Sequence, residues 1–188
     1  LLIIEKDKYL AEILKKKYHE VSIVKTHCAD ILKFNLESNI KRSSLIFGNL
    51  PYNISSQILV KTLKFKSWPP KFSDLVFMFQ KELGEKILGK FRSKNYSRLS
   101  ILTNYRLKVL SKFLVSPNCF FPKPKIKSIV IHFKPIKRDG NKIKDMNNLE
   151  KITNILFSNK RKMINKSIKK IIKNNKIKKI ENLDLKLR

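Results

Sequence analysis

The sequence predicts an α/β fold built on a mostly parallel sheet, followed by a smaller helical part. Continuous apolar runs, typical of strands buried on both faces, occupy residues 1–5, 21–25, 44–48 and 74–80. Amphipathic helical patterns at residues 8–18 and 56–65 lie between these runs. Strands that alternate with helices in this way form a doubly wound sheet.

The first two strands and the helix between them set three expectations. Residues 1–4 are apolar and lead to Glu5, which stands where such a sheet presents side chains to a ligand, although a solvated carboxylate is the simpler interpretation. Asp30, after the second run, is either an acceptor for an amino group or the cap of a turn. The helical periodicity predicts an inward face made of Tyr9, Leu10, Ile13 and Leu14.

The third run leads into the segment Asn49-Leu50-Pro51-Tyr52. Pro51 cannot continue a strand ladder, so these residues form a loop at the carboxyl end of the strand. One interpretation is a proline turn with a packed tyrosine. The other is a site for an aromatic amine: the amide oxygen of Asn49 and the carbonyl of Leu50 each accept one N–H, while Tyr52 stacks on the ring. Methyl transfer to an aromatic amine is a reaction that would need such a loop. It requires no strong base when the methyl donor is already activated, so positioning of the amine carries most of the rate.

The second half predicts helices at residues 81–90 and 98–109, then a strand at 128–133 that alternates like an antiparallel one. A charged, turn-rich linker comes next. The expected organisation is a main domain at 1–136, a linker at 137–147 and a basic helical domain at 148–188, with an amphipathic lysine-rich tail from Asn159.

The composition of the chain limits the class of its binding partner. There are 43 Lys plus Arg against 14 Asp plus Glu, a formal net charge of +29, which favours a polyanion. Only seven of the 43 are Arg, and the chain is crowded with Ile and Asn, which indicates a general compositional drift. The charge is therefore evidence for a polyanion but not for RNA specifically, and an anionic membrane surface is the competing interpretation. No apolar run approaches the roughly 20 residues of a membrane span. Cys28, Cys119 and the three histidines form no metal-binding pattern, and we expect a reducing cytoplasm.

Five stretches, in order along the chain, resemble the ribosomal RNA adenine dimethyltransferases. They are Ile3-Ile4-Glu5-Lys6-Asp7, Cys28-Ala29-Asp30-Ile31-Leu32, the Asn-Leu-Pro-Tyr loop, residues 76–82 and residues 120–128. The resemblance implies a Rossmann-like, class I methyltransferase sheet that uses S-adenosylmethionine. It assigns the donor's ribose to Glu5, the donor's adenine to Asp30, and a further donor contact to Asn49.

By the same resemblance the target adenine is held by Asn49, Leu50, Pro51, Tyr52 and Phe120. One ring of the pair Phe120 and Phe121 is expected to be buried, and Phe120 is the one expected to stack on the base. The implied reaction dimethylates the exocyclic amines of two adjacent adenines near the 3′ end of small-subunit rRNA. We expect a monomer whose partner is the immature small subunit. Two alternatives stay open: a large-subunit rRNA methyltransferase of the antibiotic-resistance type, and a binding-only assembly factor.

No glycine-rich turn precedes Glu5, because the four glycines are Gly48, Gly84, Gly89 and Gly140. The family places such a turn, with one strand and one helix, ahead of its acidic residue. We therefore expect a fragment that binds the donor poorly, shows no turnover and exposes the edge of its first strand.

Overall fold

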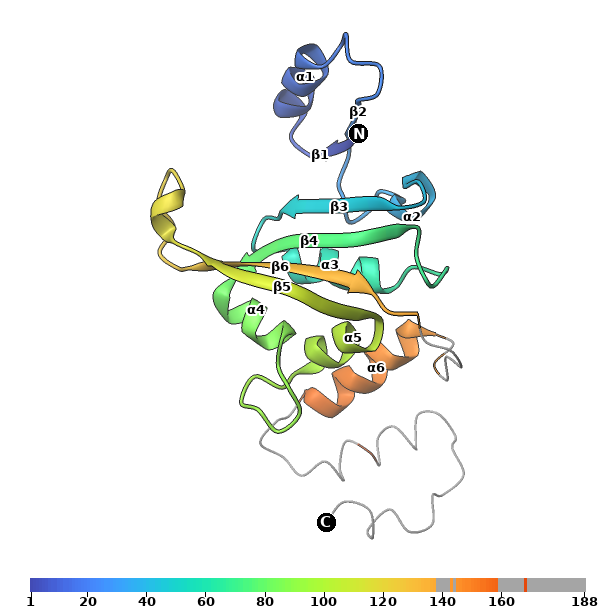
Figure 1. Cartoon of the computed structure of the whole chain (residues 1–188), viewed down its shortest axis with the longest axis vertical. Coiled ribbons are helices and arrows are strands. Elements are labelled where there is room, and N and C mark those ends of the chain that lie inside the picture. The colour runs from blue at the N-terminus through green and yellow to red at the C-terminus, as the bar shows by residue number, and fades with distance from the viewer. Residues whose placement is uncertain (138–142, 144, 159–167, 169–188) are drawn as a thin grey trace. The chain divides into compact units, whose positions relative to one another are not determined.

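The computed structural model describes residues 1–137, 143, 145–158 and 168. The chain divides into two compact units, Leu1–Gly140 and Asn141–Arg188. The elements of the first unit are β1 (Leu2–Glu5), α1 (Lys8–Lys17), β2 (Lys25–Cys28), α2 (Leu36–Asn39), β3 (Ser44–Asn49), α3 (Ser55–Leu63), β4 (Phe72–Gln80), α4 (Lys81–Ile87), α5 (Arg98–Arg106), β5 (Leu107–Val115), a 3-10 turn (Pro117–Cys119) and β6 (Ser128–Pro135). They form an α/β unit (Figure 1).

Two short parallel strands, β1 and β2, form a sheet of their own, with Glu5 opposite Cys28. The prediction of the second strand at residues 21–25 was wrong, since β2 begins at Lys25 and the apolar side chain of Ile23 is 74% exposed. The expected inward face of α1 was mostly wrong as well, since of its four residues only Leu14 is half-buried. Ala11 is its fully buried residue, whereas Tyr9, Leu10 and Ile13 are exposed, because two four-residue strands cover little of a helix.

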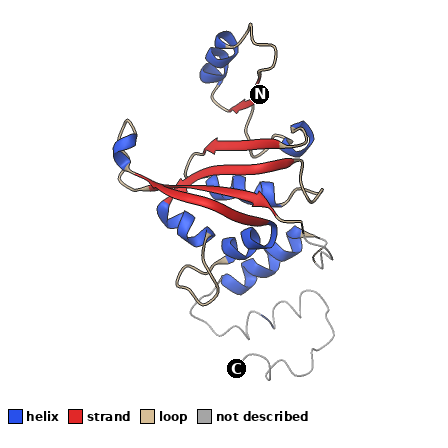
Figure 2. Ribbon diagram, viewed as in Figure 1, coloured by secondary structure: helices blue, strands red, loops and turns tan. Residues whose placement is uncertain are grey.

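The second sheet has four strands in the order β3-β4-β6-β5 (Figure 2). β3 is parallel to β4, and β6 is antiparallel to both β4 and β5, which confirms the parallel third and fourth strands and the late antiparallel strand. Side chains of β4 and β6 alternate across the sheet, and one face forms the core with α3, α4 and α5. The buried strand residues on that face are Leu75, Phe77, Phe79, Ile129, Ile131 and Phe133.

The helix predicted at residues 98–109 ends at Arg106, and β5 follows without a break. The sequence analysis did not predict this strand, because the spacing of its apolar residues fits a helix as well as a strand. The hydrogen bonds to β6 stabilise the extended conformation. The buried guanidinium of Arg106 donates to the carbonyls of Leu63 and Phe65, at 2.6 and 2.8 Å. It thereby fixes the end of α3 to α5.

The second unit contains α6 (Met146–Phe157), which agrees with the helix predicted from residue 148. Asp145 caps it by accepting the N–H of Asn147 at 2.8 Å. The basic tail predicted from Asn159 lies outside the described residues, apart from Ile168, and the predicted domain boundaries stay a prediction. Among the described residues, no helix combines the length and apolar character that a membrane crossing requires.

Candidate functional site

The loop after β3 is held by its own backbone. Asn49 is the last residue of the strand, and the N–H of Ile54 donates to the carbonyl of Pro51 at 3.1 Å. The hydroxyl of Ser55 donates to the carbonyl of Tyr52, also at 3.1 Å. The predicted proline loop therefore exists and leads directly into α3.

Gly48 allows this loop to lie close to the sheet. A Cβ at position 48 would stand 2.5 Å from Cδ2 of Leu50 and 3.2 Å from Cδ1 of Phe77. Both distances are shorter than van der Waals contact, so a larger residue would push Leu50 away. The conformation of the candidate site thus depends on the glycine that precedes it.

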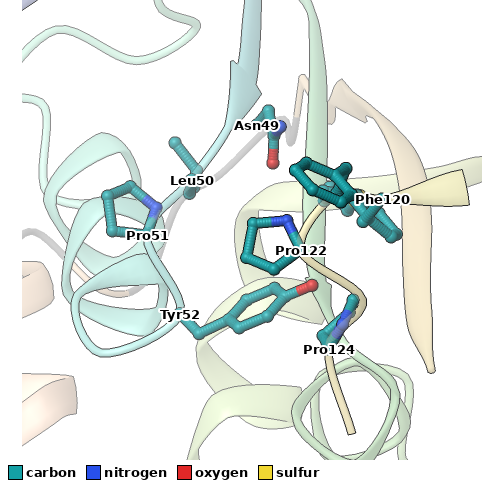
Figure 3. A pocket seen from close by; sticks show the side chains of 9 residues that line it. Asn49, Leu50, Pro51, Tyr52, Phe120, Pro122 and Pro124 are labelled. Atoms are coloured by element: carbon teal, nitrogen blue, oxygen red, sulfur yellow. The ribbon is translucent and has the colours of Figure 1, made fainter. Parts of the chain in front are cut away.

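A cleft of about 360 Å³ lies between this loop and the segment before β6 (Figure 3). That volume falls within the range of small-molecule sites. The residues that line the cleft are Asn49, Leu50, Pro51, Tyr52, Met78, Phe120, Phe121, Pro122 and Pro124. All five predicted target residues are therefore brought together, although Leu50 and Phe120 are some 70 positions apart in the sequence.

The aromatic pair beside the cleft departs from expectation. Phe121 is fully exposed and Phe120 is half-buried, so the expectation that one ring of the pair is buried was wrong. Two prolines follow the pair and stiffen the backbone, which keeps both rings out of the core. Figure 3 shows Phe120 beside Asn49 at one end of the cleft and Tyr52 at the other.

Tyr52 is fixed by a partner that sequence reasoning missed. Its phenolic oxygen lies 2.6 Å from the hydroxyl oxygen of Ser128, a fully buried residue at the start of β6. Ser128 pairs with Gln80 in the β4–β6 ladder, so the hydrogen bond anchors the tyrosine ring to the sheet. The only available signal was the position of Ser128 at the end of the stretch 120–128.

The two carboxylates predicted for the donor stand at adjacent strand ends. The N–H of Ala29 donates to the carbonyl of Glu5 at 2.8 Å, which places Glu5 and Asp30 at the same edge of the β1–β2 sheet. One carboxylate oxygen of Glu5 accepts the N–H of Asp7 at 2.8 Å. Neither carboxylate lines the cleft, so the candidate site consists of two separate parts, both within the first unit.

Asp30 is the more constrained of the two. Its Oδ1 accepts the N–H of Leu32 at 2.9 Å, and its Oδ2 lies 3.0 Å from Nζ of Lys6. The Leu32 hydrogen bond, followed by that from Lys6, lowers the pKa of Asp30. The group is therefore ionised at neutral pH, and a carboxylate with two partners keeps further acceptor positions for a ligand.

A family model described as "Ribosomal RNA adenine dimethylase" matches residues 1–186. The chain belongs to this family. It is 44% identical to "Ribosomal RNA small subunit methyltransferase A" of Pelagibacter ubique over 94% of this chain and 66% of that protein. It is 39% identical to the protein of the same name from Malacoplasma penetrans, over 97% of this chain and 64% of that protein. The chain thus spans slightly less than two thirds of the length of these relatives.

Two solved structures have a similar fold. A dimethyladenosine transferase from Plasmodium falciparum superposes with a TM-score of 0.71 and 25% identity, covering 96% of this chain and 68% of that one. The 23S rRNA methyltransferase ErmE, at 21% identity, has a TM-score of 0.61 over 90% of this chain and 66% of its own. The fold is accordingly the Rossmann-like class I methyltransferase fold that the family resemblance implied.

Proposed function

We propose that this chain carries the catalytic part of an S-adenosylmethionine-dependent enzyme that dimethylates two adjacent adenines of small-subunit rRNA. The observation that carries the proposal is the cleft in which Asn49, Tyr52 and Phe120 meet. An amide and two aromatic rings at one strand end suit a flat base with an exocyclic amine. The names of the Pelagibacter and Malacoplasma relatives support the small subunit as the substrate.

The target adenine would be held through its amine. The side-chain oxygen of Asn49 and the main-chain carbonyl of Leu50 each accept one N–H, which directs the nitrogen lone pair out of the ring plane. Tyr52 and Phe120 contact the faces of the base, and Pro51 keeps the loop rigid. Once the nitrogen has gained a methyl group it releases a proton to water, so the residues contribute position rather than a strong base.

The methyl donor would bind to the carboxylates of Glu5 and Asp30 at the ends of the two parallel strands β1 and β2. The second carboxylate oxygen of Glu5 can accept hydrogen bonds from the two ribose hydroxyls of the donor. Asp30 is an ionised acceptor for a hydrogen bond from the amino group of the donor's adenine. Asn49, at the end of β3, would also contact the donor. When bound, the donor supplies a methyl group already activated by its sulfonium.

The charge of the chain is compatible with an RNA partner, which the names of the relatives support. With a net charge of +29, the chain is attracted to rRNA phosphates by a mechanism independent of sequence. We include in the proposal that the protein acts as a monomer in the cytoplasm, on an immature small subunit.

The test is methyl incorporation from radiolabelled donor into isolated small and large ribosomal subunits. Two proteins are compared: the chain alone, and the chain with a family-like amino-terminal segment joined before Leu1. Label in two adjacent adenines of the small subunit alone supports the proposal. Label in the large subunit favours the resistance-type enzyme instead. Tight binding without label from either protein favours an assembly factor.

A further inference from the structure

The ammonium group of Lys61, near the candidate site, donates to three main-chain carbonyl oxygens. Lys61 lies on α3, and its ammonium nitrogen is 2.9, 2.7 and 2.7 Å from the carbonyl oxygens of Ile31, Leu32 and Phe34. The three acceptors are some 30 residues away in the sequence, in the segment between β2 and α2. One side chain therefore joins that segment to the helix that begins at the cleft.

The geometry defines what Lys61 can do. An ammonium group has three N–H donors, and three carbonyls occupy them. Burial lowers the pKa of Lys61, while the nearby Asp30 carboxylate acts in the opposite direction. With its donors engaged by backbone, Lys61 has none left for a substrate, and its role is to hold the segment in place.

The segment that Lys61 holds is the turn that presents Asp30. The N–H groups of Lys33 and Phe34 both donate to the main-chain carbonyl of Asp30, each at 2.9 Å. The N–H of Leu32 donates to the Asp30 carboxylate. Two residues whose carbonyls Lys61 binds, Leu32 and Phe34, are therefore the same residues whose N–H groups orient Asp30.

We propose that Lys61 is a positioning residue that sets recognition of the donor's adenine by holding the Asp30 turn against α3. The proposal rests on the proposed donor role of Asp30. Because α3 starts three residues after Tyr52, the same lysine also fixes the donor site relative to the loop for the target base. A displaced turn would weaken the selection of adenine more than the binding of the rest of the donor.

The experiment measures a preference, which a general loss of structure would not change selectively. S-adenosylhomocysteine and its hypoxanthine counterpart, S-inosylhomocysteine, are titrated by calorimetry into the chain joined to a family-like amino-terminal segment. The second ligand replaces the amine with a carbonyl oxygen that cannot donate to Asp30. The unmodified protein should prefer the first by about tenfold, the effect expected from leaving the part-buried Asp30 carboxylate without a donor.

In Lys61→Met the preference should fall to about threefold or less, while the affinity for S-inosylhomocysteine changes by less than about twofold. Lys61→Arg should recover part of the preference, because a guanidinium can still donate to several carbonyls. Lys61→Gln, which keeps two donors, serves if the methionine variant does not fold. In an Asp30→Asn background, Lys61→Met should have no further effect on the preference.

Two control variants separate positioning from general loosening. Glu37→Ala removes another anchor of the same region, since its carboxylate accepts the N–H groups of Lys66 and Ser67 at 3.0 and 2.8 Å. Lys86→Met removes an exposed lysine from α4. Both should keep the preference for the adenine ligand. An equal loss for both ligands in Lys61→Met would overturn the proposal, whereas an unmodified protein that binds neither ligand would overturn the proposed donor site itself.

Discussion

The hydrogen bond between Tyr52 and Ser128 allows the rigidity of the cleft to be measured as a free energy. Tyr52→Phe keeps the ring but leaves the fully buried hydroxyl of Ser128 without this partner. A buried polar group without its partner costs about 1–3 kcal/mol, so this variant should lose that much in free energy of unfolding. Ser128→Ala leaves the half-buried tyrosine hydroxyl near water, and should lose only about 0.5–1.5 kcal/mol.

The double variant should lose about as much as Ser128→Ala alone, because removing both partners leaves nothing unsatisfied. Urea unfolding followed by fluorescence of Trp68 gives the free energies. That residue is the single tryptophan, and its indole N–H donates to the carbonyl of Ile136 at 2.9 Å, within the same unit. Tyr9→Phe, which removes a hydroxyl from a ring that is 74% exposed, is the control and should change stability by less than about 0.5 kcal/mol.

Additive losses in the double variant would refute the coupling. So would a Tyr52→Phe protein as stable as the unmodified chain, since Ser128 would then have another partner or access to water. Either result would mean that the tyrosine ring is not fixed to the sheet through Ser128.

Three further predictions concern other parts of the chain. The hydrogen bond from His132 lowers the pKa of the Asp74 carboxylate in the folded protein. The stability that this hydrogen bond provides is therefore fully present above pH 3.8, the ordinary pKa of the group, and is lost as the pH falls through the lower folded-state pKa. Urea unfolding between pH 6 and 3 should show a smaller acid loss in Asp74→Asn, and an identical loss would contradict this. Gly48→Val should displace Leu50, cost about 1–3 kcal/mol by overpacking and abolish methyl transfer, whereas a fully active variant would show that the loop tolerates the shift. Removing residues 160–188 should weaken rRNA binding and flatten its salt dependence without changing donor affinity, and an unchanged salt slope would exclude phosphate contacts by that segment.

Several features of the site could be read from residue types in short windows. Pro51 after an apolar run predicts a loop at a strand end, because proline removes a ladder donor, and that loop is present. The parallel pairing of β3 with β4 follows from two apolar strands separated by a helix. In both cases the local sequence and the tertiary structure favour the same conformation.

Elsewhere the tertiary structure outweighs local pattern. The polar residues Lys25–Cys28 form β2 because β1 supplies a partner, while the apolar side chain of Ile23 just before them is left exposed. Contacts that join distant segments leave little or no trace in the local sequence. Lys61 reaches carbonyl groups, which every residue has, and Tyr52 reaches a serine 76 positions away. These contacts position the candidate site, and only the folded chain reveals them.

The measurement that tests the central claim most directly compares rate with affinity at Asn49. In the chain joined to a family-like amino-terminal segment, the single-turnover rate of methyl transfer and the dissociation constant for small-subunit RNA are determined for Asn49→Ala. Asn118→Ala, which changes an exposed asparagine before Phe120, is the control. Because the amide acts on the amine mainly in the transition state, the rate should fall by about 100-fold or more while RNA affinity stays within about twofold. A variant that keeps its rate, or that loses rate and RNA affinity equally, would contradict the assignment of Asn49 as the residue that orients the target amine.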